Sequence, residues 1–108
     1  MKGYQIGCSV AFAIAYAAQM QASVTESKSV ISIAMAGAGT LTLATDSQPV
    51  PGDEIILKVS SDATARDLTF GAGFTAPVLT GVINKTKVQR FVFDGSNFIA
   101  TGAAFQIN

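Results

Sequence analysis

The length of 108 residues suits one domain with a single modest core and leaves no room for a second catalytic lobe. Seven basic and seven acidic residues cancel, so the chain lacks the field that would attract nucleic acid or an anionic membrane surface. Histidine is absent and Cys8 is the single cysteine, which excludes an internal disulfide, the usual zinc or copper sites, and Ser-His-Asp or Cys-His catalysis. We therefore predict a protein without enzymatic activity, metal or cofactor.

The charged fraction of the chain is low. Only 13% of the residues are charged, against about 25% in an average soluble domain. So few charges cover the surface of a free monomer poorly, and a net charge near zero favours association. The composition therefore predicts an obligate assembly in which other chains cover part of the surface.

The N-terminal segment, residues 1–25, has no charge between Lys2 and Glu26. Its strictly apolar run covers 10–18, which is shorter than the about 20 residues of a transmembrane helix, so a membrane span is excluded. A cleaved secretory leader stays an alternative, with Lys2 as its basic start and a cut after Ala17 or Ala22. Met20 argues against the second cut, because a small residue is preferred at the third position before the cleaved bond.

Large and small side chains alternate within this segment, because an alanine follows each of Val10, Phe12, Ile14 and Tyr16. A period of two is the strand period, but alanine also favours helices, so a strand and a short helix over 9–21 both remain open. In either form the segment is apolar on both faces, which predicts an interface with another chain. The predicted contact residues are Val10, Phe12, Ile14, Tyr16 and Met20.

Residues 26–108 alternate between short apolar segments and turn residues, with no visible internal repeat. A capping-box pattern at 23–26 would begin a helix, but the β-branched Val30-Ile-Ser-Ile33 that follows favours a strand. Strands spaced about ten residues apart predict a compact antiparallel β-sandwich or barrel of about seven or eight short strands, in a single domain over 1–108. The predicted strands are 29–36, 40–45, 54–60, 66–70, 78–83, 88–94 and 97–101.

Turn residues account for the remaining motifs. Asp94-Gly95 lies between two apolar segments and predicts a hairpin, because glycine readily adopts the positive φ that such turns need. Neither Gly37-Ala-Gly39 nor Gly71-Ala-Gly73 extends to a phosphate-binding G-x-G-x-x-G pattern, so we interpret both as turns. Asp62 and Asp67 flank another turn, where turn formation is favoured over a calcium or sugar site.

Two stretches of the chain, within residues 50–102, resemble small β-domains of tailed-phage fibres and head decorations. In 51–74, an apolar strand leads through a polar turn to Arg66-Asp-Leu-Thr-Phe-Gly-Ala-Gly-Phe74. In 88–98, the motif is Phe91-Val-Phe-Asp-Gly-Ser-Asn-Phe98. The short chain and its apolar N-terminal segment are most similar to the head-fibre proteins of crAss-like phages. The sequence departs from that pattern at Phe98, where a tryptophan is common, and lacks a long repetitive shaft.

This resemblance implies a virion structural protein on the capsid exterior, made in the host cytoplasm. It implies a homotrimer that docks on other capsid or head-fibre proteins, with a host-surface glycan as a further candidate ligand and no catalytic residues. Neither nucleic acid nor a membrane is expected as a partner. Two alternatives stay open: a carbohydrate-binding or host-adhesion module, and an exported bacterial β-protein with a leader peptide. Two tyrosines and no tryptophan give few aromatic platforms for a sugar, which counts against the first alternative.

Overall fold

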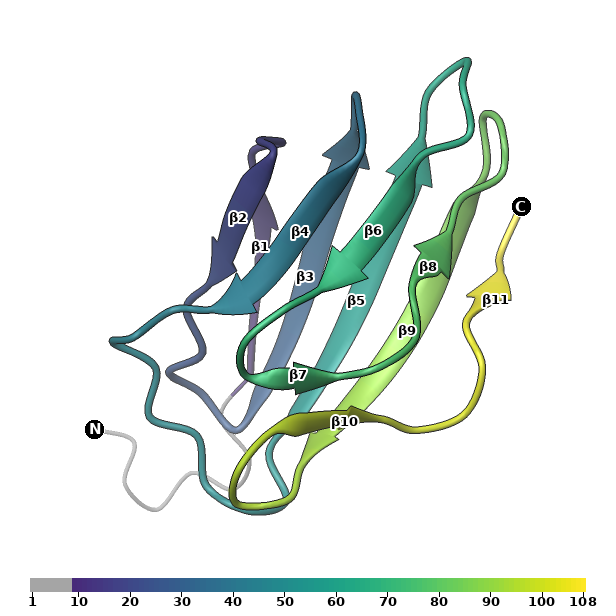
Figure 1. Cartoon of the computed structure of the whole chain (residues 1–108). Helices are drawn as coiled ribbons and strands as arrows, with labels where there is room; N and C mark the ends of the chain where they lie inside the picture. The colour runs from purple at the N-terminus through teal and green to yellow at the C-terminus, as the bar shows by residue number, and fades with distance from the viewer. Residues whose placement is uncertain (1–8) are drawn as a thin grey trace.

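The computed structural model describes residues 9–108, which form eleven strands and no helix (Figure 1). The predicted mainly-β class is confirmed for this part of the chain. The strands are β1 (Ser9–Ile14), β2 (Gln19–Ala22), β3 (Lys28–Met35), β4 (Gly39–Leu43), β5 (Glu54–Ser61), β6 (Asp67–Phe70), β7 (Phe74–Thr75), β8 (Leu79–Thr80), β9 (Thr86–Phe93), β10 (Phe98–Ala100) and β11 (Phe105–Gln106).

The strands form two sheets that lie face to face (Figure 1). The first sheet has seven strands in the order β1-β3-β5-β9-β10-β7, with β11 also paired to β9. The second sheet has four, in the order β2-β4-β6-β8. Successive side chains of a strand point to opposite faces, so Ile55, Leu57 and Val59 of β5 are buried while the residues between them point outward. The inward faces of both sheets form one hydrophobic core.

The chain alternates between the two sheets, so that neighbouring strands in the first two-thirds of the chain are parallel. In the first sheet β1, β3 and β5 pair in parallel, and in the second sheet β2, β4 and β6 do the same. We call the pairs β1/β2, β3/β4 and β5/β6 the first, second and third coils. Stacked coils of this kind are the arrangement of β-solenoids. The expectation of an antiparallel sandwich is therefore wrong for these coils.

The turn between β3 and β4 shows why the sequence was misleading. Gly37-Ala-Gly39 marks a change of direction, as predicted, but it carries the chain across to the opposite sheet instead of back along the same one. Turn residues show where a strand ends and not which strand pairs with the next one. Gly39 is buried at this crossing, where an added Cβ would lie 2.8 Å from the Met20 side chain and 3.1 Å from the Ala17 carbonyl oxygen.

Antiparallel pairing is found where the coils end. In the first sheet β9 runs antiparallel to β5, and in the second sheet β8 runs antiparallel to β6. The predicted hairpin at Asp94-Gly95 is confirmed, because β9 and β10 pair antiparallel with Phe93 opposite Phe98 and Gly95 has a φ of 108°. The Asp94 carboxylate accepts hydrogen bonds of 2.8 Å from the backbone amides of Ser96 and Asn97, which closes the turn.

A cluster of phenylalanines fills the core next to this hairpin. Ring centroids within it lie 5.0 to 5.9 Å apart in tilted or edge-on pairs, a range in which aromatic pairs attract beyond simple burial. Both stretches that carry the phage-domain resemblance contribute to it, so their aromatic residues have a structural role. The members are Phe70, Phe74, Phe91, Phe93 and Phe98.

Six of the predicted strands lie within two residues of β3, β4, β5, β6, β9 and β10. The prediction of a strand over 78–83 is wrong beyond Leu79 and Thr80, which alone form β8. After β8 the chain turns at Asn84, whose φ is 58°, and leaves Val82 and Ile83 exposed. The apolar residues at 82–83 predict a strand from composition, but they have no partner strand to pair with among the described residues.

Candidate functional site

The described part of the apolar N-terminal segment forms strands, those of the first coil, and not the helix that was the alternative. Within it, Phe12, Ile14 and Tyr16 point inward and pack against the core while staying half-buried. Val10 lies on the same face and is 37% exposed. These side chains lie at the end of the sandwich, where no further coil covers them among residues 9–108. Their large/small alternation therefore separates an inward face from an outward one.

The predicted contact residue Met20 lies elsewhere from the other four. It belongs to β2, points into the core and is only 3% exposed. Its side chain is close to Gly39 of the second coil, so its contacts are within its own chain. Contact of Val10, Phe12, Ile14 and Tyr16 with another chain stays a prediction.

Tyr16 ties the first coil to the second. Its hydroxyl donates a hydrogen bond of 2.7 Å to the Ala38 carbonyl, in the loop between β3 and β4. Its ring lies against Gly37, where an added Cβ would overlap with it. The glycine pattern that we interpreted as a turn therefore also makes room for this ring.

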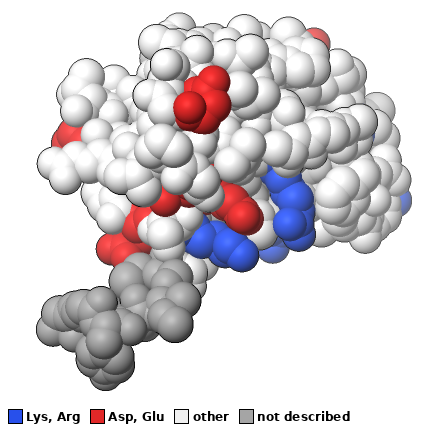
Figure 2. Space-filling view, turned by 90° about the horizontal axis from the view of Figure 1, so that it is seen from below, with Lys and Arg blue, Asp and Glu red and all other residues white. Residues whose placement is uncertain are grey.

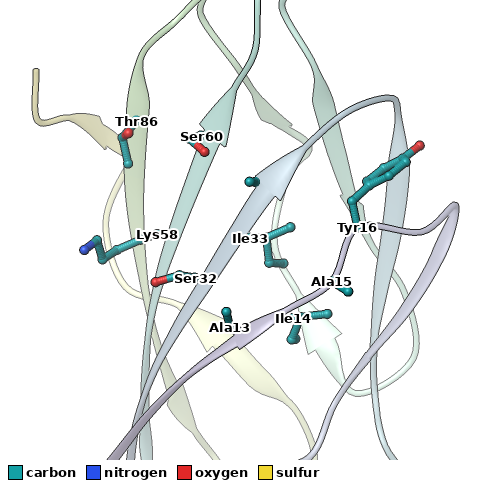
Figure 3. Close-up of a pocket in the computed structure, with 10 residues that line it drawn as sticks. Ala13, Ile14, Ala15, Tyr16, Ser32, Ile33, Lys58, Ser60 and Thr86 are labelled. Carbon is teal, nitrogen blue, oxygen red and sulfur yellow. The ribbon is translucent and has the colours of Figure 1, made fainter.

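The outward face of the first coil carries small residues that continue into a hollow. Ala11, Ala13, Ala15 and Ala17 are exposed there. The hollow has a volume of about 530 Å³ and crosses β1, β3, β5 and β9 of the first sheet. Figure 3 shows its polar side chains, which lie together on three of these strands, with Tyr16 set apart from them. They are Ser32, Lys58, Ser60 and Thr86.

The hollow has the character of a contact surface more than of a ligand site. Its lining consists mainly of alanine and hydroxyl side chains, with Lys58 as its cation. Tyr16 is the aromatic residue at its margin, and its hydroxyl is already bonded to Ala38. Apart from Tyr16, whose ring lies against Gly37, its described lining has no aromatic ring on which a sugar could stack.

Apolar residues extend this outer face beyond the hollow. Phe105 of β11 pairs with Val88 of β9, and both Phe105 and Ile107 are about half exposed. Strand β11 was not predicted from the sequence. Its signal was the apolar alternation Phe105-Gln-Ile107 near the C-terminus, which is too short to stand out from a loop.

The first coil has no charged residue from Ser9 to Thr25, and the charge nearest to it in the sheet is Lys28 of β3, which pairs with Ser9. Lys28 and Glu54 form an ion pair of 3.8 Å between β3 and β5, with both side chains 47% exposed. Viewed from below, Figure 2 shows acidic and basic side chains next to each other in the lower part of the view, a few others apart from them, and most of the visible surface free of charge. The first coil itself contributes no charge to this surface.

Asp62 and Asp94 serve turns as predicted, whereas Asp67 begins strand β6. Asp62 accepts hydrogen bonds from Arg66 at 2.9 and 3.0 Å, and this partner, together with the Thr64 amide, lowers the pKa of the Asp62 carboxyl. The amides of Asn97 and Ser96 lower the pKa of Asp94 in the same direction. Asp53 is buried and accepts a hydrogen bond from the Val50 amide, whereas its neighbour Glu54 points outward.

No cluster of three potential metal ligands occurs among residues 9–108, and Cys8 lies outside the described residues. Across the same residues, no helix is long and apolar enough to cross a membrane. Comparison with known proteins finds no matching family model, no similar curated protein and no similar solved structure.

Proposed function

We propose that this chain is a homo-oligomeric structural module, without enzymatic activity, that uses its first coil to join other copies of itself. One observation carries the proposal: the first coil has no charge and, among residues 9–108, pairs on one side only. Within residues 9–108, β1 pairs only with β3 and β2 only with β4. Unpaired strand edges with apolar side chains beside them favour association with another chain.

The setting that we propose is the exterior of a phage capsid, as a head fibre or capsid decoration. The support is the resemblance of the two C-terminal stretches to phage fibre and head-decoration domains. These stretches include β6, β7 and the β9–β10 hairpin, whose phenylalanines pack together. The resemblance implies a trimer and docking on other head proteins, made in the host cytoplasm.

Light scattering on the purified chain tests the oligomeric part of the proposal. We expect a mass that is a multiple of the chain mass of 11.1 kDa, at protein concentrations of about 100 µM. A monomer throughout would refute it. Mass spectrometry of purified phage particles tests the setting separately: the chain should be present in a fixed ratio to the major capsid protein, and its absence from the particles would refute the virion role.

A further inference from the structure

The two ends of the coil stack differ in what they offer to a neighbour. At the far end the outermost strands β7, β8 and β11 have two residues each, and Pro77 lies just before β8. Short edge strands and proline limit pairing between sheets of different molecules. At the N-terminal end, β1 has six residues and β2 has four, without proline or charge. The described chain protects one end and leaves the other able to pair.

We propose that the open end binds a second copy of the chain, with β1 pairing antiparallel to the β1 strand of that copy about a twofold axis. The inference rests on the proposed homo-oligomeric function and adds the surface and the symmetry of the contact, which is a twofold dimer in place of the trimer that the phage resemblance implies. An edge strand carries main-chain donors and acceptors that an antiparallel partner satisfies. We place the twofold axis perpendicular to the sheets. Because β1 and β2 lie at the same end of the sandwich (Figure 1), each sheet of one copy then lies edge to edge with the same sheet of the second copy.

The alternation within β1 restricts the register of this pairing. Side chains directly opposite each other in an antiparallel pair point to the same face. An inward residue such as Phe12 must therefore meet an inward residue of the second copy, and an outward alanine must meet an outward one. This condition is met when the axis passes through Ala11 or through Phe12. Each choice pairs about five residues per copy, and the outer face at the junction then carries only alanine and serine.

A second copy also suits the chemistry of the end. Because residues 9–25 have no charge, a symmetric contact places no like charges opposite each other. The half-buried Phe12, Ile14 and Tyr16 would be covered by the same residues of the second copy.

The area of the end matches a dimer of modest affinity. Strand β1, with its six residues, is about 20 Å long and the molecule is 25 Å across each of its two shorter axes, so each copy covers on the order of 500 Å². The total of about 1,000 Å² is near the lower limit for a specific interface. We expect a dimer that dissociates in the micromolar range.

The competing contact surface is the outer face of the first sheet, with its hollow and the exposed Phe105 and Ile107. Two lysine substitutions separate the alternatives. Ala11→Lys introduces a positive charge on the edge strand β1, close to the same lysine of the second copy. Ala34→Lys introduces the same charge on the same face but on β3, one strand further in. Both alanines are exposed, so neither change removes a core contact.

Sedimentation velocity over about 1 to 100 µM protein measures the effect. We expect Ala11→Lys to raise the dimer Kd about tenfold or more, because lysines then meet near the axis, and Ala34→Lys to leave it unchanged. If both substitutions weaken the dimer, or if neither does, the proposed contact between β1 edges is wrong, although the chain can still be a homo-oligomer. A wild-type chain that is monomeric at every concentration would overturn the proposed function itself.

A cross-linking experiment checks the antiparallel geometry directly. In a Cys8→Ser background, the double substitution Ala11→Cys and Ala13→Cys places thiols opposite each other in both allowed registers, 11 with 11 or 11 with 13. A short bifunctional thiol reagent should give a covalent dimer in high yield, and Ala34→Cys in the same background should not. Equal yields from the two variants, or no covalent dimer from the first while the protein remains oligomeric, would overturn the proposed pairing.

Discussion

Replacing Ser29 with alanine is expected to stabilise the fold, although serine to alanine in a sheet usually has little effect. Ser29 lies on the inward face of β3, between Val10 of β1 and Ile55 of β5 in the register of the first sheet. Its side chain is fully buried, and its hydroxyl has no hydrogen-bond partner in the described chain. No group of residues 9–108 therefore replaces the water that this hydroxyl loses on burial.

The size of the effect follows from this environment. A buried polar group without a partner costs about 1 to 3 kcal/mol. Alanine removes that cost and gives up the contacts of one oxygen atom, each worth about 0.1 to 0.2 kcal/mol. We expect Ser29→Ala to raise the free energy of unfolding by about 1 kcal/mol, and Ser29→Val to gain less, because the added methyl group must fit a packed core.

Urea denaturation followed by circular dichroism measures the change, with Ser32→Ala as the matched control. Ser32 lies on the same strand but points outward and is partly exposed, so its replacement should shift the free energy of unfolding by less than about 0.5 kcal/mol. A loss of about 1 kcal/mol or more for Ser29→Ala would contradict the reasoning, because it would mean that the buried hydroxyl makes a stabilising hydrogen bond.

Three further predictions concern the C-terminal half. Phe98→Ala should lower the free energy of unfolding by about 3 to 5 kcal/mol, since Phe98 is fully buried, whereas Phe105→Ala, at a side chain 51% exposed, should cost much less in the same denaturation assay. Gly73→Ala should destabilise more than Gly52→Ala; both glycines have positive φ, but an added Cβ overlaps Leu43 only at Gly73. Folding lowers the pKa of the Asp94 carboxyl. The contribution of Asp94 to the free energy of unfolding should therefore be complete above the ordinary pKa of 3.8. It should be lost as the pH falls through the lower pKa of the folded chain. Urea titrations of Asp94→Asn and of the unsubstituted chain at pH values from about 2 to about 6 check this, and a difference between them that does not shrink on acidification would contradict it.

Local structure in this chain is largely predictable from the sequence. The β-branched alternation Val30-Ile-Ser-Ile33 correctly indicated a strand over a competing capping pattern, because alternate residues need to be buried on one face. Asp94-Gly95 correctly located a hairpin, because few residues other than glycine adopt its backbone conformation without strain. These features depend on neighbours in sequence, and they could be predicted for that reason.

Strand pairing was not predictable in the same way. Gly37-Ala-Gly39 serves equally well for a hairpin and for a crossing to the opposite sheet, and the choice depends on contacts with Met20 and Tyr16 from another coil. The coils also differ in length, since Ser9 pairs with Lys28 but Lys28 pairs with Glu54. Without a constant period, the sequence shows no repeat even though the structure stacks three coils.

The sequence indicated the same segment from which the candidate site is built, but it did not distinguish the two faces of that segment. The uncharged alternation Val10 to Tyr16 predicted a segment apolar on both faces. The structure gives these two faces different roles, because the bulky residues pack inward against their own core and the alanines point outward. What the sequence could not show is that β1 and β2 end both sheets together, since this depends on the order of strands in space.

Light scattering over a dilution series shows whether the first coil joins copies of this chain. We expect a mass of twice 11.1 kDa at high concentration that falls toward 11.1 kDa on dilution. Ala11→Lys should shift the transition to higher concentration, and Ala34→Lys should leave it in place. A mass of 11.1 kDa at every concentration, or a stable assembly that both lysine variants leave unchanged, would contradict it.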